Sequence, residues 1–204
     1  TPFRMGDCAG DAAAALQLLG VAPAIVVGYS MGGAIAQLMA RDHADVVSGL
    51  ILSGTAQHWQ DPETRRAFKA LGAVGVLLSV APRTTWRAGM RRVGLRESAE
   101  TAWIMSEAMR HSVPDLVEAG RELARFDSRP WLAPMPMPTA VVVTSRDQAV
   151  PPRKQHELAG ALAAQVFDAP INHLDITTNR ATYNPVLLQA LSALGGLREN
   201  AAVA

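Results

Sequence analysis

The chain has 204 residues, of which 49% are hydrophobic and 18% charged, a composition that supports a buried core and excludes intrinsic disorder. Its 19 basic and 18 acidic residues leave a net charge of +1, which excludes strong electrostatic attraction to nucleic acid or to an anionic membrane. The single cysteine, Cys8, excludes an internal disulfide and fits a reducing compartment, so we expect a cytoplasmic protein. The longest apolar run, residues 73–81, is far shorter than the about 20 residues of a membrane-spanning helix.

The first 58 residues alternate between helical and strand patterns. Asp7 is predicted to cap a first helix that ends at Gly20. The apolar face of this helix is predicted to consist of Ala12, Leu16 and Leu19. Residues 24–28 and 47–53 are short β-branched runs, typical of strands buried on both faces of a parallel sheet, and the helical pattern that begins at Met31 lies between them. This order favours an α/β fold with parallel strands.

Residues 59–133 interrupt this alternation with patterns that are only helical. The segment contains three side chains at positions typical of a helix N-cap, namely Asp61, Ser98 and Ser112. We therefore expect a helical insertion at residues 59–133, between the two parts of an α/β core at residues 1–58 and 134–204.

The α/β pattern resumes after the insertion. Residues 139–144 are predicted to form a third strand, residues 152–162 a helix and residues 164–167 a fourth strand. The dipeptide Asn184-Pro185 is expected to begin a final helix, because proline suits the first helical position.

The segment GYSMGG at residues 28–33 stands where the first strand meets the following helix, and it matches the G-x-S-x-G nucleophile elbow. Gly28 and Gly32 are expected to make room for a strained turn at Ser30. Since the turn opens a helix, the backbone N–H of Met31 is a candidate donor to an oxyanion. An incidental serine in a glycine-rich turn would give the same sequence, but the strand before it and the helix after it favour the nucleophile elbow.

A serine nucleophile needs a base to take its proton and an acid to orient that base. Asp147 follows the third predicted strand and His173 follows the fourth, so both are expected at the same sheet edge as Ser30. The alternatives for the acid are Asp168 and Asp175, and those for the base are His43, His58, His111 and His156. Cys8 is interpreted as an ordinary helix residue, and Thr1 lacks the context of an N-terminal nucleophile.

With these residues in this order, the chain resembles the α/β-hydrolase superfamily, most closely its bacterial haloperoxidase-like or esterase-like members with a helical cap. The resemblance implies that Ser30 is the nucleophile, Asp147 the acid and His173 the base, and that residues 59–133 form the cap. Asn172 stands where the family usually has glycine, a mild departure because asparagine tolerates a left-handed backbone.

The resemblance also implies an N-terminal truncation. Only 29 residues precede Ser30, which is room for one helix and one strand, so the family's first four strands and its second oxyanion donor are expected to be missing. The strand at residues 24–28 would then lie at an exposed edge of the sheet, unpaired or paired with another chain in a homo-oligomer.

Two classes of function follow from the sequence. The first is a serine hydrolase of a small ester or related acyl substrate, which needs neither a metal nor an organic cofactor, and which includes perhydrolase or acyltransferase variants. The second is a truncated hydrolase relic that acts as a binding or inert module. Loss of one oxyanion donor costs about 10²- to 10³-fold in rate, so truncation predicts weak chemistry rather than none.

Overall fold

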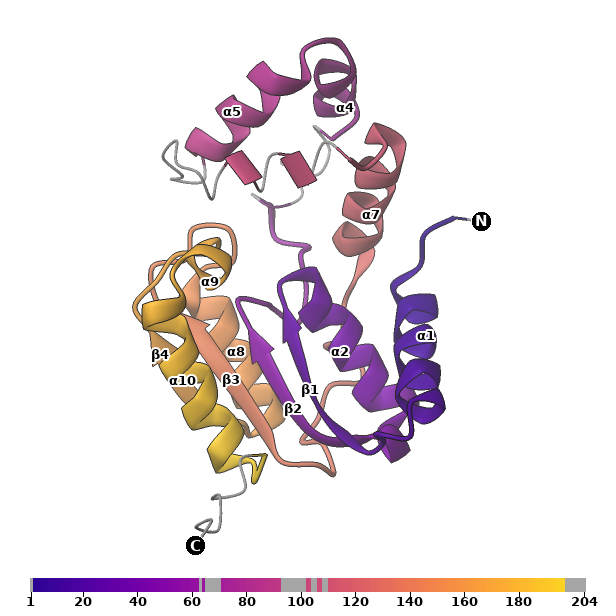
Figure 1. Ribbon diagram of the computed structural model, residues 1–204, viewed down its shortest axis with the longest axis vertical. Helices are drawn as coiled ribbons and strands as arrows, with labels where there is room; N and C mark the ends of the chain where they lie inside the picture. The colour runs from indigo at the N-terminus through magenta and orange to yellow at the C-terminus, as the bar shows by residue number, and fades with distance from the viewer. Residues whose placement is uncertain are drawn as a thin grey trace, which may run out of the picture. The chain divides into compact units, whose positions relative to one another are not determined.

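Four short apolar segments pair into one parallel sheet in the computed structural model of the protein (Figure 1), in the order β1-β2-β3-β4. The strands are β1 (Ala24–Tyr29), β2 (Val47–Ser53), β3 (Thr139–Thr144) and β4 (Gln165–Ala169). The predicted parallel α/β fold is confirmed, as are the bounds of β2 and β3. The predicted fourth strand is displaced, since β4 begins one residue later and ends two residues later than residues 164–167.

The structure describes residues 2–62, 64, 71–92, 102–103, 106–107 and 110–196. The chain divides into two compact units. The helical unit comprises Thr1–Arg4 and His58–Asp127, and the sheet unit comprises Met5–Gln57 and Ser128–Ala204.

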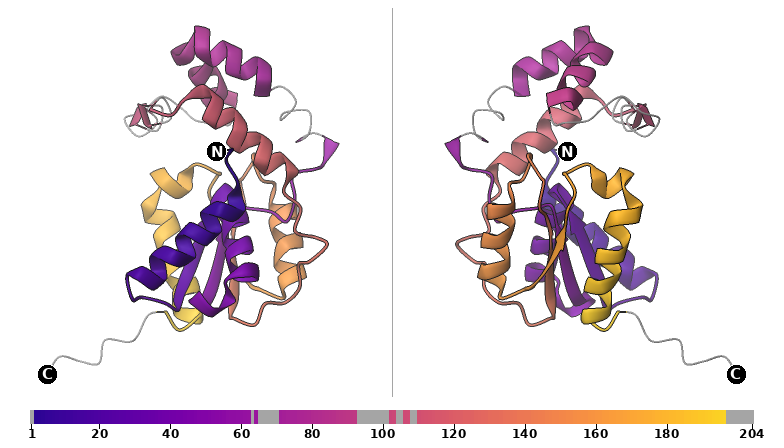
Figure 2. Two further views of the ribbon diagram at one scale, coloured as in Figure 1. Left: turned by 90° about the vertical axis from the view of Figure 1, so that its right-hand side faces the viewer. Right: turned by 90° about the vertical axis from the view of Figure 1, so that its left-hand side faces the viewer.

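Helices cover both faces of the sheet (Figure 2). On one face lie α1 (Met5–Leu18), α2 (Met31–Asp42) and α8 (Pro152–Leu162), and on the other lies α10 (Arg180–Ala193). Two short helices, η1 (Ala44–Val46) and α9 (Asp175–Thr178), lie in the connections before β2 and after β4. The predicted helix at residues 152–162 is confirmed.

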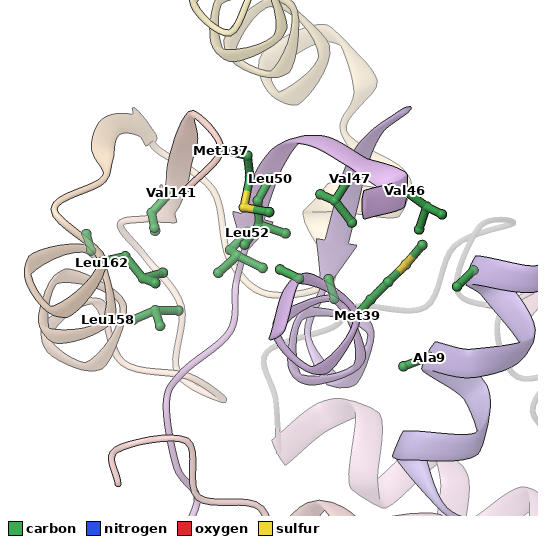
Figure 3. Close-up of a cluster of buried hydrophobic side chains, with 14 of the residues drawn as sticks. Ala9, Met39, Val46, Val47, Leu50, Leu52, Met137, Val141, Leu158 and Leu162 are labelled. Atoms are coloured by element: carbon green, nitrogen blue, oxygen red, sulfur yellow. The ribbon is translucent and has the colours of Figure 1, made fainter. Parts of the chain in front are cut away.

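The central strands supply both hydrophobic clusters through their two-residue side-chain period. Leu50 and Leu52 of β2 share one cluster with side chains of α1, α2 and α8 (Figure 3), while Ile51 shares the other cluster with side chains of α10. All six residues of β3 are buried. The cluster that contains Leu50 and Leu52 also includes Ala9, Met39, Val141, Leu158 and Leu162. This packing holds the two central strands, and therefore the polar residues after them, in a rigid frame.

Strand β1 is the first strand of the described sheet and pairs with β2 on one side. Its Val27 side chain is 43% exposed, although Ile25 packs against the cluster beneath α10. The expectation that this strand lies at a sheet edge is confirmed, whereas the expected burial of both its faces is wrong. Pairing of this edge with a second chain stays a prediction.

The buried face of α1 differs from the predicted one. The buried residues are Met5, Ala9 and Ala13, and Leu16 packs against the core cluster as predicted, whereas Ala12 and Leu19 are exposed. The small alanine side chains let α1 pack closely on α2, and this contact outweighs burial of the larger leucine. Because the helix begins at Met5, Asp7 lies in its first turn and is not its cap. Gly20 has a φ of 66° and follows the helix, as predicted.

The final helix begins earlier than predicted. It starts at Arg180, and the side chain of Asn179 accepts a hydrogen bond from the backbone N–H of Thr182 as its cap. Pro185 therefore lies inside the helix. The asparagine five residues upstream, Asn179, competes better for the cap position than Asn184, because α10 then also buries Tyr183.

The helical unit includes α4 (Leu71–Val80), α5 (Pro82–Arg92) and α7 (Val113–Arg125). Two predicted caps are confirmed: Asp61 accepts a hydrogen bond from the Thr64 N–H, and Ser112 accepts one from the Asp115 N–H. Ser98 lies outside the described residues. None of the described helices combines the length and apolar character that a bilayer crossing demands.

A buried hydrogen-bond network joins α2 to the two points where the chain leaves and re-enters the sheet unit. The Gln37 amide donates to the carbonyls of Gly33 and Ala56, at 3.2 Å each. The Ser128 hydroxyl donates to Gln37 Oε1 at 2.8 Å, and its N–H donates to the Gln57 carbonyl at 2.8 Å. Residues of the sheet unit on either side of the helical unit are thereby bound to α2, the helix that follows Ser30.

The observed face of α1 can be tested with one matched pair of variants. Ala9→Leu should lower the free energy of unfolding by about 1–3 kcal/mol, because the added side chain overpacks the contact with α2. Ala12→Leu should change it by less than about 0.5 kcal/mol, because that position is exposed. Urea denaturation measures both, and equal losses would contradict the observed face.

Candidate active site

The turn between β1 and α2 holds Ser30 in a backbone conformation that side chains rarely adopt. Its φ is 53° and its ψ is −120°. The Ser30 N–H donates to the Ser53 carbonyl at 3.0 Å, and its own carbonyl accepts from the Gly33 N–H at 2.9 Å and the Thr55 hydroxyl at 2.8 Å. Three hydrogen bonds therefore hold the strained residue, and two of them come from β2 or the residues just after it.

The glycines that this turn requires are Gly28 and Gly33. A Cβ on Gly28 would lie 2.6 Å from the Gly32 carbonyl oxygen and 2.7 Å from the Ala36 Cβ. A Cβ on Gly33 would lie 2.5 Å from the Thr55 Cβ. The steric role predicted for Gly32 is wrong, because a Cβ there meets nothing within 4 Å. The sequence shows two adjacent glycines, Gly32 and Gly33, after Ser30. Only the packing of Thr55 shows that Gly33 is the one that must lack a side chain.

The structure brings together the three side chains predicted to form the site. His173 Nε2 lies 2.9 Å from Ser30 Oγ, and His173 Nδ1 lies 2.7 Å from Asp147 Oδ2. The three residues follow β1, β3 and β4, whose carboxyl ends meet at one edge because the strands are parallel. The Asp147 side chain is fully buried, whereas that of His173 is 15% exposed.

Each carboxylate oxygen of Asp147 accepts two hydrogen bonds. Oδ2 binds His173 and the Thr144 hydroxyl, which lies 2.8 Å away. Oδ1 accepts the backbone N–H groups of Ala149 and Val150, both at 2.8 Å. Because an ionised carboxylate only accepts, the proton in the contact with His173 belongs on Nδ1. In this tautomer His173 Nε2 is left to accept a proton from Ser30.

A second layer of polar side chains holds the acid in place. Gln155 is fully buried, and its amide donates to Thr144 Oγ1 at 2.8 Å and to the Val150 carbonyl at 2.7 Å. Its Oε1 accepts the Thr144 N–H at 2.9 Å. The sequence analysis missed Thr144 and Gln155, because a polar residue in a strand and one in a helix carry no motif.

The loop that carries His173 is closed by its own side chains. Asn172 Oδ1 accepts the N–H groups of Leu174 and Asp175, at 3.0 and 3.1 Å, and Asp175 Oδ2 accepts the Asn172 N–H at 3.0 Å. Asn172 does not use the left-handed conformation that asparagine tolerates: in the described part of the chain, Ser30 and Ala163 are the non-glycine residues with positive φ. At this position, where the family usually has glycine, Asn172 stabilises the loop through the hydrogen bonds that its side chain accepts.

The other candidate acids and bases have different surroundings. Asp175 closes the loop described above, and Asp168 is an exposed residue of β4. The alternative histidines are His43 at the end of α2, His58 as an acceptor from the Gln60 N–H, and the exposed His111 and His156. Of these carboxylates and imidazoles, the pair in contact is Asp147 and His173.

Tyr29 is a further residue of the site that the sequence analysis missed. Its hydroxyl donates to the His173 carbonyl at 2.7 Å, and the two rings lie 5.0 Å apart between centroids. Burial, and to a lesser degree the charge of Asp147, raises the pKa of the Tyr29 phenol well above its usual value, so the hydroxyl stays a donor. The one sequence feature that could have indicated Tyr29 is its position directly before the elbow serine.

Two further features bear on the chemistry. Met31 is the first residue of α2, so its backbone N–H belongs to the donors that a helix leaves without an intrahelical partner. Within the described ranges, no three His, Cys, Asp or Glu side chains gather closely enough to hold a metal ion.

The elbow glycines give a second matched pair of variants. Gly33→Ala should destabilise the protein by about 1–3 kcal/mol, because its Cβ collides with Thr55 beside the Ser30 carbonyl. Gly32→Ala should be neutral or stabilise by up to about 1 kcal/mol, because it places alanine in a helix with open space around it. Thermal and urea unfolding check the difference, and the reverse order would contradict the geometry.

Known proteins are similar to this chain over almost its whole length. RutD of Klebsiella pneumoniae subsp. pneumoniae, which is named for carbamate hydrolysis, is 26% identical over 203 residues, covering 94% of this chain and 74% of that protein. An esterase from Exiguobacterium antarcticum has a TM-score of 0.81 at 18% identity, and the enol-lactonase from Burkholderia xenovorans has 0.77 at 21%. Each alignment covers 94% of this chain, with 75% of the esterase and 74% of the lactonase.

These solved structures share the fold of the chain. The α/β-hydrolase resemblance is confirmed by a family model. The family model described as serine aminopeptidase, S33, matches residues 5–171, a span that contains Ser30 and Asp147 and ends two residues before His173. The chain therefore belongs to the serine aminopeptidase S33 family of the α/β-hydrolase superfamily.

Proposed function

We propose that the protein is a serine hydrolase that cleaves a small ester or related acyl compound through a covalent acyl-enzyme. The observation that carries this proposal is the unbroken hydrogen-bond chain from Ser30 through His173 to Asp147. Membership of a hydrolase family supports it independently.

In this mechanism Ser30 Oγ attacks the substrate carbonyl while His173 Nε2 takes its proton. The 2.9 Å contact is within the reach that proton transfer to a general base requires. Asp147 holds the imidazole in the tautomer whose Nε2 accepts, and its charge stabilises the imidazolium that forms. The four hydrogen bonds to Asp147 keep its carboxylate in position during this step.

The negative charge on the substrate oxygen would develop next to the first turn of α2. There the N–H of Met31 is a suitable donor, and the helix dipole favours an anion. His173 then gives its proton to the leaving group, and water attacks the acyl-enzyme with His173 again as the base. No step of this scheme uses a metal or an organic cofactor.

We propose that the helical insertion at residues 59–133 acts as a cap over a small-molecule substrate. A carbamate is a second candidate substrate, because the relative RutD is named for its hydrolysis. The same attack applies to it, since a carbamate also presents a carbonyl with a leaving group.

A fluorophosphonate probe tests the nucleophile directly. The native chain should be labelled once, and Ser30→Ala should abolish labelling because the attacking oxygen is gone. His173→Ala should slow labelling by at least about 10³-fold. His156→Ala, which removes an exposed histidine, should label at the native rate. In-gel fluorescence measures the rates. A native chain that does not react would reject the proposal in favour of a binding or inert module, and labelling of Ser30→Ala would place the nucleophile elsewhere.

The acid can be tested together with the substrate class. We expect Asp147→Asn to lower kcat by up to about 10⁴-fold, because the amide no longer favours the reactive tautomer of His173. Asp168→Asn, an exposed change on β4, should leave kcat unchanged. The rates are measured with p-nitrophenyl acetate and with a p-nitrophenyl carbamate. Faster turnover of the carbamate would replace the ester proposal, and an unchanged kcat in Asp147→Asn would remove that residue from the mechanism.

A further inference from the structure

Tyr29 connects the two halves of the proposed proton-transfer pair. It is the last residue of β1 and immediately precedes Ser30, so its backbone belongs to the same rigid turn. Its hydroxyl donates to the backbone carbonyl of His173, 144 positions further along the chain, at 2.7 Å. One side chain therefore joins the backbone that carries the serine to the backbone that carries the imidazole.

We infer that Tyr29 is a positioning residue that sets the distance between Ser30 Oγ and His173 Nε2. The inference rests on the proposed serine hydrolase function. Ser30 is fixed by hydrogen bonds to β2 and to the residues after it, whereas His173 lies in the loop between β4 and α9. The contacts of Asn172 and Asp175 shape this loop locally but do not reach β1. The Tyr29 hydroxyl adds a hydrogen bond between the loop and the elbow, beside the contact of His173 Nε2 with Ser30 Oγ.

The packing around Tyr29 supports a role in orientation as well as in distance. Its ring lies against the imidazole of His173 with an interplanar angle of 42°. Gly54, with a φ of 52°, adjoins the Tyr29 ring, the Asp147 carboxylate and the His173 imidazole. A Cβ on Gly54 would lie 3.3 Å from Tyr29 Cε2 and 3.5 Å from both Asp147 Oδ2 and His173 Nδ1. The imidazole is therefore confined by the tyrosine ring on one side and by the backbone after β2 on another.

The chain supplies its own control, because it contains two tyrosines. Tyr183 is buried in α10 and belongs to the hydrophobic cluster that includes Ile51 and Val142. Removing either hydroxyl deletes one oxygen atom from a largely buried aromatic residue. A loss of rate with a purely structural cause should therefore appear in both Tyr29→Phe and Tyr183→Phe. A loss caused by misplacement of His173 should appear in Tyr29→Phe and not in Tyr183→Phe.

The experiment compares Tyr29→Phe with Tyr183→Phe in the full chain. We expect Tyr29→Phe to slow fluorophosphonate labelling and to lower kcat for p-nitrophenyl acetate by about 10- to 100-fold, with KM unchanged, because a misplacement of about 1 Å costs up to about 10²-fold. Tyr183→Phe should keep the native rates. ¹⁵N-labelled histidine side chains provide a second signature: the ring signals of His173 should shift in Tyr29→Phe and stay in place in Tyr183→Phe.

The outcomes separate this inference from the function on which it rests. If the native chain labels at Ser30 and Tyr29→Phe labels as fast as Tyr183→Phe, Tyr29 is a structural residue and the inference is overturned. The same holds if KM rises while kcat is unchanged. If the native chain does not label at all, the hydrolase proposal itself fails.

A second pair of variants covers the case in which Tyr29→Phe does not fold. Tyr29→p-aminophenylalanine keeps a para donor, and Tyr29→p-methylphenylalanine fills the same volume without one. We expect the amino variant to label at close to the native rate and the methyl variant to label about 10- to 100-fold more slowly. Equal rates in these two variants would overturn the inference.

Discussion

The positive φ of Ser30 is the constraint on which the rest of the site depends. Such a conformation costs of order 1–3 kcal/mol and persists only where the surroundings over-determine it. Here the carbonyl of Ser53, the hydroxyl of Thr55 and the N–H of Gly33 all bind the Ser30 backbone. The strain is therefore maintained by the pairing of β1 with β2, and the tightly packed glycines of the turn are the local condition for it.

The rest of the site is held by a network of hydrogen bonds between buried polar atoms. The carboxylate of Asp147 accepts four of them, and Thr144 is itself held by Gln155. In the described part of the chain, no buried side-chain nitrogen or oxygen lacks a partner. Because an unsatisfied buried polar group is costly, such a network fixes one geometry of the acid and, through it, one tautomer of His173.

Much of the fold could be predicted from local patterns, and the failures have identifiable physical causes. Continuous apolar runs predicted β2 and β3 with their observed bounds, because a strand buried on both faces has few alternatives. The face of α1 was wrong in part, because Ala12 and Leu19 were placed on it whereas close packing on α2 buries Ala9 and Ala13. The start of α10 was wrong because Pro185 was taken as a boundary, although tertiary packing retains it inside the helix.

The sequence by itself determined which three side chains meet at the sheet edge, because the elbow motif and the positions of Asp147 and His173 after strands leave few other arrangements in a parallel sheet. Only the tertiary structure decided which neighbours hold these groups. Whether Gly32 or Gly33 needs its missing side chain depends on Thr55, and the contact between Tyr29 and His173 joins positions 144 residues apart. Such contacts depend on how strands and loops meet in space, so no local pattern contains them.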